Sequence, residues 1–205
     1  MTIATKRFSF VEYLAYDDGT DTRYELVDGE LVEMGVGTGL HGAILKYLEK
    51  VFEVGIARLG LLWVSLAALV SVRSPRSGRW DTSRIPDVVM LLAEQWQAMR
   101  QREAVVELND PAPLLVVEVV SESTKTTDYR YKQVEYAVRD IPEYWVVDPL
   151  AAKVTVFTLL EGMYDRTEFT GSDPSGNGEA ARLQSPTFSD LQLTAAQILN
   201  AGEVV

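Results

Sequence analysis

The sequence of 205 residues contains no cysteine and a single histidine. The absence of cysteine excludes disulfide bonds and thiolate metal sites, and it is typical of the reducing cytoplasm, where we expect this chain to act. Basic residues are also scarce, because 19 Lys and Arg stand against 30 Asp and Glu, which gives a formal net charge of −11. Such an acidic chain repels phosphate backbones, so its charge argues against tight nonspecific binding of DNA or RNA.

Long apolar segments are missing as well. The longest run, residues 61–72, contains two serines and is too short to span a bilayer, so we expect no membrane association. The N-terminal residues carry two cations without an apolar stretch after them, which does not resemble a signal peptide. With 47% hydrophobic residues, the composition predicts one globular domain over residues 1–205.

The hydrophobic pattern predicts an α/β fold whose mixed sheet is flanked by helices. Asp28-Gly29 and Glu161-Gly162 predict an N-terminal and a C-terminal hairpin, over residues 23–34 and 153–169. Helices are expected at 8–16, 41–59, 123–139 and after Thr194, strands at 61–73, 85–92, 114–120 and 143–147, and loops at 74–83 and 171–178. The helix at 123–139 carries Tyr131, Val134 and Val138 on one side. Its crossover position between two strands predicts a partly parallel sheet.

Each of two apolar strands contains a carboxylate. Asp87 follows Ile85-Pro86 and precedes Val88-Val89-Met90, and Glu118 lies within Leu114 to Val120. A charged carboxylate in such surroundings costs several kcal/mol unless it is paired or bound to a metal. Each acid could instead be solvated at a strand end or paired with an arginine such as Arg84. Because Mg²⁺ and Mn²⁺ prefer oxygen ligands, two such strands suggest a shared divalent cation held by Asp87 and Glu118.

The segment from Asp128 to Tyr136 supplies a third element. Asp128, Lys132 and Tyr136 are spaced i, i+4, i+8 and share a helix face directly after the strand that carries Glu118. Lys132 could therefore reach the acids, where an ammonium group would orient a water or offset negative charge on a phosphate. From spacing alone, an exposed Asp128–Lys132 helix pair is the favoured explanation.

These motifs, taken in order, resemble a known family. The segments are Ile85-Pro86-Asp87, Leu114 to Ser121 with Glu118, Asp128…Lys132…Tyr136, and Ile141 to Pro149, together with Tyr24 to Val32 and His41-Gly42. They are similar to the Uma-type restriction endonuclease family of the PD-(D/E)xK nuclease superfamily, over a core of about residues 8–195. The resemblance implies a restriction-endonuclease-like core, Asp87 and Glu118 as metal ligands, and the main-chain carbonyl of Val119 as a further ligand.

The resemblance also implies a catalytic lysine, but at an unusual place. The superfamily usually has lysine two residues after the second acid, where this chain has Val120. The lysine of this family lies in the following helix, which makes Lys132 the candidate, with Lys125 as its rival.

Three further residues gain a role from the resemblance. Glu25 would be an additional acid that helps a second metal or orders water, although its hairpin position alone suggests a solvent-facing residue. His41 would line the site and contact phosphate or water, although alone it suggests a helix-start residue that is hydrogen-bonded within the fold. Arg84 would contact a phosphate or pair with an acid. The alternating Gly35, Gly37 and Gly39 suggest a flexible hinge.

The sequence thus predicts a Mg²⁺-dependent (or Mn²⁺-dependent) deoxyribonuclease, an enzyme that hydrolyses DNA phosphodiester bonds at Asp87, Glu118 and Lys132 with help from Glu25 and His41. A homodimer is a further expectation, since two sites related by a twofold axis suit cleavage of both strands. The alternative is a catalytically silent nuclease fold that serves as an interaction or assembly module. The strong acidity favours this alternative. Exposed aromatic residues at Trp80, Trp96 and Tyr164 could then serve its interface, although core packing is the commoner use of such residues.

Overall fold

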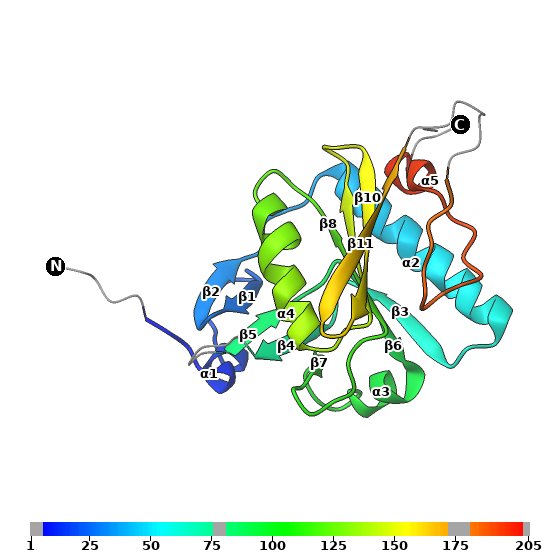
Figure 1. Ribbon diagram of the computed structural model, residues 1–205. Coiled ribbons are helices and arrows are strands. Elements are labelled where there is room, and N and C mark those ends of the chain that lie inside the picture. The colour runs from blue at the N-terminus through cyan, green and yellow to red at the C-terminus, as the bar shows by residue number, and fades with distance from the viewer. Residues whose placement is uncertain (1–5, 76–80, 172–180, 203–205) are drawn as a thin grey trace.

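The computed structural model describes residues 6–75, 81–171 and 181–202. Within these ranges the chain forms two sheets with helices around them (Figure 1). The strands are β1 Tyr24–Val27, β2 Glu30–Glu33, β3 Trp63–Ala67, β4 Ser71–Pro75, β5 Asp81–Arg84, β6 Val88–Leu92, β7 Val105–Val106, β8 Leu115–Val119, β9 Glu143–Asp148, β10 Lys153–Leu160 and β11 Met163–Thr170. The helices are α1 Phe10–Leu14, α2 Gly39–Leu59, α3 Ala93–Ala98, the π-helical η1 Thr127–Lys132, α4 Gln133–Val138 and α5 Ala195–Leu199.

The larger sheet has six strands in the order β11-β10-β9-β8-β6-β3. Its β8–β9 pair is parallel and its other pairs are antiparallel, so the predicted partly parallel sheet is confirmed. The crossover between β8 and β9 runs through η1 and α4, as the sequence predicted. The second sheet, in the order β2-β1-β5-β4-β7, pairs β4 with β7 in parallel and its other strands antiparallel.

Helices cover both faces of the larger sheet (Figure 1). On one face, Ile44, Leu48 and Phe52 of α2 pack with Val117 and Val119 of β8. On the other face, Tyr136 of α4 packs with Val116 and Val120. Because successive side chains of a strand point to opposite faces, Glu118 shares the face of Val116 and Val120, beneath η1 and α4.

Both predicted hairpins are present. The β1–β2 turn places Asp28 and Gly29 at φ values of 50° and 78°, and the β10–β11 turn places Glu161 and Gly162 at 50° and 81°. Positive φ at both central residues is the conformation of the tight hairpin turn that Asp-Gly favours. The turn residues therefore favour each hairpin through their own backbone conformation.

The segment around residue 70 differs from the prediction. Residues 61–73 were expected to form one β segment, but they form β3 and the start of β4, which lie in different sheets and are separated by Ala68 at φ 48°. The segment 74–83, predicted as a loop, contributes Ser74 and Pro75 to β4 and Asp81–Ser83 to β5. Ser83 of this segment is buried, and its hydroxyl shares a 2.6 Å contact with the hydroxyl of Ser71 in β4.

The predicted helix at 123–139 forms mostly as η1 followed by α4, but its apolar stripe does not face the core. Tyr131, Val134 and Val138 are exposed, whereas Asp128 and Lys132 are buried. The physical reason is that the buried charges are paired, so their desolvation is offset by opposite charge. A pattern that counts only apolar residues cannot identify such a face.

None of the helices in the described ranges is both long and apolar enough to cross a bilayer. Most of the predicted loop at 171–178 lies outside the described residues, as does Trp80. Trp96 and Tyr164 were expected to be exposed, but both are partly buried against the core of the larger sheet. Tyr164 also donates a hydrogen bond of 2.7 Å to the carbonyl of Ile141.

Candidate active site

Glu118 lies in the middle of the site and is 2% exposed. The ammonium Nζ of Lys132 is 2.7 Å from its Oε2. The hydroxyl of Tyr136 donates a hydrogen bond of 2.6 Å to its Oε1. Burial raises the pKa of Glu118 to about 8, against the opposing charge of Lys132 and with the added repulsion of Asp87. A carboxyl with such a pKa is stabilised in its charged form by any cation that binds beside it.

Asp87 directly precedes β6 and lies next to Glu118. Val88 of β6 pairs with Val117 of antiparallel β8, so continuing the register by one residue brings Asp87 opposite Glu118. The main-chain N–H of Val119 donates a hydrogen bond of 2.6 Å to Oδ2 of Asp87. Alternation along β6 gives Asp87 the same face as Val89, the face that η1 and α4 cover. The two predicted metal acids thus lie on one face of the sheet.

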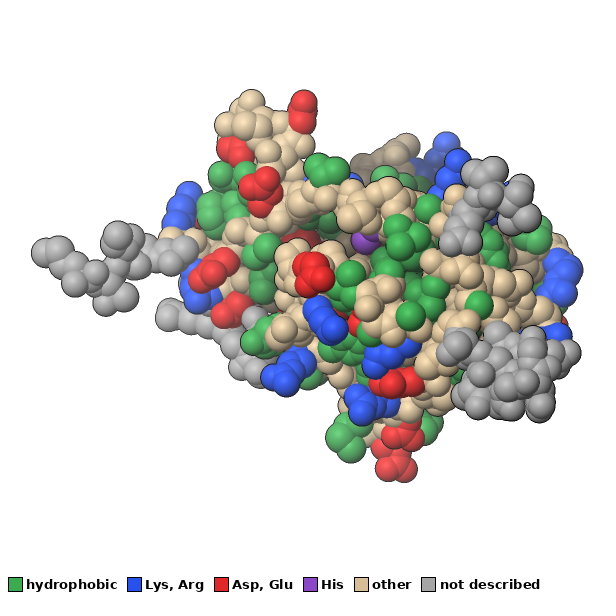
Figure 2. All heavy atoms as spheres, turned by 90° about the horizontal axis from the view of Figure 1, so that it is seen from above, with side chains coloured by type: hydrophobic (Ala, Val, Ile, Leu, Met, Phe, Trp, Pro, Cys, Tyr) green, Lys and Arg blue, Asp and Glu red, His purple; other side chains and the backbone are tan. Residues whose placement is uncertain are grey.

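His41 reaches Asp87 from the first turn of α2. Thr38 caps this helix, and its hydroxyl accepts the main-chain N–H of His41. Nε2 of His41 is 3.2 Å from Oδ2 of Asp87. This hydrogen bond raises the pKa of His41 above its ordinary value, although burial works against the rise. Seen from above, the histidine is the purple side chain recessed in the face of the molecule, so the site opens there (Figure 2).

Gly37 has a steric role beside this histidine. A Cβ at Gly37 would lie 2.8 Å from Nδ1 of His41, which is too close for a regular contact. The glycine therefore lets the imidazole ring occupy its place against the loop. The sequence suggested only a hinge for Gly35, Gly37 and Gly39, and nothing lies within 4 Å of a Cβ built at Gly35 or Gly39.

Lys132 and its rival Lys125 lie in different surroundings. Lys132 is 6% exposed and contacts Glu118 at 2.7 Å and Asp128 at 3.1 Å. Burial works to lower the pKa of Lys132, but the carboxylates around it, Glu118 foremost, outweigh burial and raise the pKa. Lys125 is half exposed, and its Nζ lies 3.8 Å from Asp148. The structure therefore brings Lys132, and not Lys125, into contact with the acid.

Glu25 and Arg84 form a second buried ion network behind these residues. Arg84 donates to Glu25 through Nη1 at 3.0 Å and to Glu135 through Nε at 2.8 Å. The N–H of Ile85 donates to the other oxygen of Glu25 at 2.9 Å. Glu25 is 8% exposed, so it is not the solvent-facing hairpin residue that its position alone suggested. Arg84 pairs with acids, the second of its two predicted alternatives.

Glu135 is the member of this network that the sequence did not indicate. It is 2% exposed in α4 and accepts both Nε and Nη2 of Arg84, which lies 51 positions earlier in the chain. Bidentate pairing of this kind fixes the geometry of both side chains. No local spacing could have revealed it, because its partner Arg84 lies on β5, a distant strand of the second sheet.

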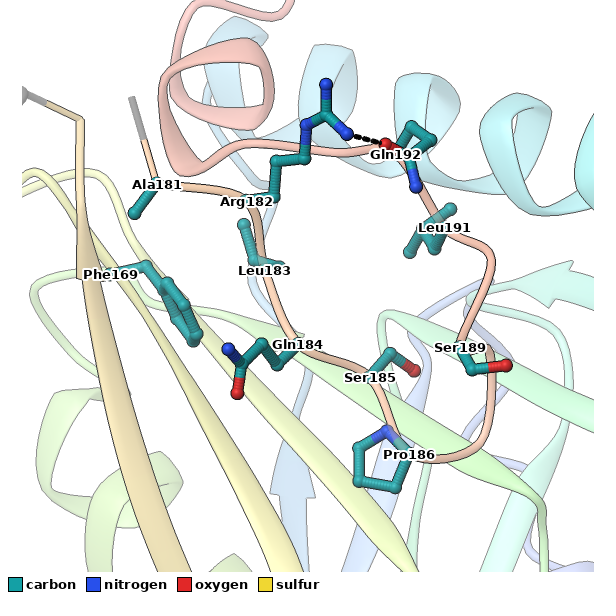
Figure 3. A pocket seen from close by; sticks show the side chains of 10 residues that line it. All are labelled: Phe169, Ala181, Arg182, Leu183, Gln184, Ser185, Pro186, Ser189, Leu191 and Gln192. Carbon is teal, nitrogen blue, oxygen red and sulfur yellow. Dashed lines mark hydrogen bonds between the residues drawn. The ribbon is translucent and has the colours of Figure 1, made fainter. Parts of the chain in front are cut away.

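A separate cavity of about 760 Å³ lies at the C-terminal segment. Figure 3 shows its lining, which includes Phe169, Leu183, Gln184 and Leu191, with Arg182 hydrogen-bonded to Gln192 across its rim. The acids Asp87 and Glu118 are not among its lining residues. The volume of this cavity therefore says nothing about the carboxylate site.

The donor set at Asp87 and Glu118 suits a hard divalent cation. No group of three His, Cys, Asp or Glu side chains that could hold a metal occurs in the described parts of the chain. A site for zinc or another ion that needs several protein ligands therefore does not fit these residues. Mg²⁺ commonly keeps several waters and uses one or two carboxylates, which is what Asp87 and Glu118 offer. The peptide of Val119, whose N–H is fixed on Asp87, lies at the same place.

Comparison with known proteins decides the family. The model of the Uma2 family, described as "Putative restriction endonuclease", matches residues 10–196. The chain belongs to the Uma2 family. A solved structure of "a putative nuclease belonging to DUF820" from Anabaena variabilis is similar to this Uma2 protein, with a TM-score of 0.72 and 17% identity over 94% of this chain and 98% of that one. None of the curated proteins compared with the chain matches it.

The resemblance seen in the sequence is therefore confirmed, and so is the restriction-endonuclease-like fold. Family and fold together support a nuclease as the general class of this Uma2 protein.

Proposed function

We propose that this Uma2 protein is a Mg²⁺- or Mn²⁺-dependent deoxyribonuclease with a PD-(D/E)xK-type site at Asp87, Glu118 and Lys132. The observation that carries the proposal is the 2.7 Å contact between Lys132 and Glu118, on the face of the sheet that Asp87 also shares. Family membership supports the reaction class, and the donor chemistry of the two acids supports the metal.

The position of Lys132 supports its assignment as the lysine of the nuclease motif. Val120, where the superfamily usually has lysine, points to the same face as Glu118 and is buried against α4. The ammonium group of Lys132, from the helix above, lies at Glu118 on the same side of the sheet to which residue 120 points. This supports Lys132 as the catalytic lysine that the family carries on the helix after the second acid. Lys125 lies 3.8 Å from Asp148 and not at Glu118, so its position does not support the same role.

Each side chain has a task that follows from its contacts. Asp87 and Glu118 would hold the cation, with the carbonyl of Val119 as a third protein ligand. A divalent ion bound there supplies charge stabilisation and an activated water for attack on phosphorus. Lys132 stays protonated among carboxylates, so it donates hydrogen bonds to a phosphate oxygen and offsets its growing negative charge.

His41 completes the open side of the site. Its ring is held on Asp87, and its raised pKa favours the charged form, which suits contact with a phosphate at the entrance. For Glu25 we propose a supporting task. Both of its oxygens accept hydrogen bonds from Arg84 and Ile85, so it supports the site from behind through the Arg84 network and does not offer a free oxygen to a second ion.

The decisive experiment is nicking of supercoiled plasmid DNA with Mg²⁺ or Mn²⁺. We expect activity in the wild type, loss with EDTA, and loss in Asp87→Asn, Glu118→Gln and Lys132→Met with the fold retained by circular dichroism. Lys125→Met is the matched control, because it removes an exposed lysine of the same segment and should keep activity. Full Mg²⁺-dependent nicking by Asp87→Asn or Glu118→Gln would refute the proposal.

The interaction module remains the second candidate because of the net charge of −11. The partial burial of Trp96 and Tyr164 removes two of the three aromatic residues first expected at its interface. Calorimetric titration with Mg²⁺ separates the two functions, since a module needs no metal and should show no binding at millimolar concentration. Light scattering would test the predicted homodimer under either function.

A further inference from the structure

Asp128 is a buried carboxylate that the proposed chemistry does not use. It is 1% exposed in η1. Neither of its oxygens has a hydrogen bond of regular geometry within the described chain. Its Oδ1 lies 3.1 Å from Nζ of Lys132. Because an unpaired buried carboxylate is strongly destabilising, the ammonium group must supply most of the compensation for this charge.

The same ammonium group also compensates Glu118. Nζ of Lys132 is 2.7 Å from Oε2 of Glu118, so one cation bridges two buried carboxylates that come from different elements, η1 and β8. Bridging two carboxylates is also what a divalent cation does in a two-metal nuclease site. In this protein a lysine occupies that bridging place, and it is covalently fixed there by a π-helical turn, a feature that recurs at functional sites.

The ammonium group of Lys132 excludes a metal ion from the space between Glu118 and Asp128. Its Nζ lies 2.7 Å from Oε2 of Glu118 and 3.1 Å from Oδ1 of Asp128, so it fills the place where an ion that bridges these two acids would sit. A divalent ion brought to that place would also be repelled by the ammonium charge. One place for an ion is then left, beside Asp87 and Glu118.

We propose that the ammonium group of Lys132 takes the place of a second divalent cation between Glu118 and Asp128, so that the protein binds a single metal ion. This inference rests on the proposed function, because it assumes the metal at Asp87 and Glu118. It names Asp128 as the acid that holds Lys132 in place and as a latent metal ligand. Removing the ammonium group should therefore open a second metal site.

The test is the stoichiometry of Mn²⁺ binding, measured by calorimetry and by electron paramagnetic resonance, which distinguishes an isolated ion from a coupled pair. We expect one Mn²⁺ per chain in the wild type and two, spin-coupled, in Lys132→Met. The double variant Lys132→Met with Asp128→Asn should return to one. Lys125→Met, the matched control, should bind one like the wild type.

Two Mn²⁺ ions in the wild type, or one in Lys132→Met, would overturn the inference that Lys132 takes the place of a second cation. Neither result would contradict the proposed metal-dependent nuclease. No Mn²⁺ in any variant overturns the proposed function as well. Lys132→Met should unfold more easily without metal and regain stability with Mn²⁺, since the ion replaces the lost charge. If Mn²⁺ stabilises Lys132→Met no more than it stabilises the wild type, the inference is contradicted. A Lys132→Met protein that stays unfolded in the presence of Mn²⁺ counts as this result.

Discussion

Tyr136→Phe tests how the buried hydroxyl orients Glu118. The hydroxyl donates a hydrogen bond of 2.6 Å to Oε1, while Lys132 holds the other oxygen. Tyr136 is fully buried and packs edge-on against Tyr144, with ring centroids 5.1 Å apart, so phenylalanine should fill the same space. The substitution therefore removes one hydrogen bond and little else, which makes its effect interpretable.

The magnitude follows from the charge of the acceptor. A hydrogen bond to a charged group contributes about 1.5–3 kcal/mol. If Glu118 is a metal ligand, losing this bond costs orientation and charged-state stability, and we expect the affinity for Mn²⁺ to fall about 10- to 100-fold. Nicking at subsaturating Mn²⁺ should fall in parallel and should recover in part when Mn²⁺ is raised.

Calorimetric titration with Mn²⁺ measures the effect, and Tyr164→Phe is the control. Tyr164 belongs to the same aromatic cluster, but its hydroxyl donates to the carbonyl of Ile141 and not to a carboxylate. We expect Tyr164→Phe to lose some stability and to bind Mn²⁺ like the wild type. Equal affinity in Tyr136→Phe and the wild type, within about twofold, would refute the reasoning that Glu118 binds the metal.

Three further predictions concern stability, pH and the entrance of the site. Arg84→Met leaves the buried acids Glu25 and Glu135 without their cation, so it should lower the free energy of unfolding by about 3–5 kcal/mol in urea titrations. The control Lys153→Met breaks a more exposed ion pair with Glu168 and should lower it by about 0–1 kcal/mol. In EDTA, burial raises the pKa of Glu118 to about 8 in the folded protein, whereas the unfolded chain releases this proton near pH 4.5. The folded state therefore binds more protons between these pH values, so the free energy of unfolding of the wild type, relative to Glu118→Gln, should fall as pH rises from 4.5 to 8 and level off above 8. A difference between the two proteins that does not change with pH would contradict the raised pKa. Gly37→Ala should displace the histidine ring and lower nicking by up to about 100-fold, whereas Gly35→Ala, with open space around it, should not.

Features set by neighbouring residues could be predicted from the sequence. Asp28-Gly29 fixes the first hairpin because both residues adopt positive φ there. The helix from Gly39 to Leu59 follows from its apolar periodicity, and its core side chains are those that the period selects. The carboxylates Asp87 and Glu118 could be found because each interrupts an apolar strand, which is costly without a partner or a metal.

Features set by long-range charge pairing could not be predicted. The polar segment from Asp81 to Ser83 has no apolar alternation, yet it forms a central strand of the second sheet, and the next residue, Arg84, is buried between two acids. The helix over residues 127–138 buries Asp128, Lys132 and Glu135 and exposes Tyr131 and Val134, the reverse of what an apolar stripe indicates. In both places the buried side is determined by partners on distant elements.

Anomalous diffraction from crystals soaked in Mn²⁺ tests the metal site most directly. The account predicts one anomalous peak, in contact with the carboxylates of residues 87 and 118 and close to the peptide of residue 119. Density at other acids only, or none at millimolar Mn²⁺, would contradict a metal-dependent nuclease site in this fold.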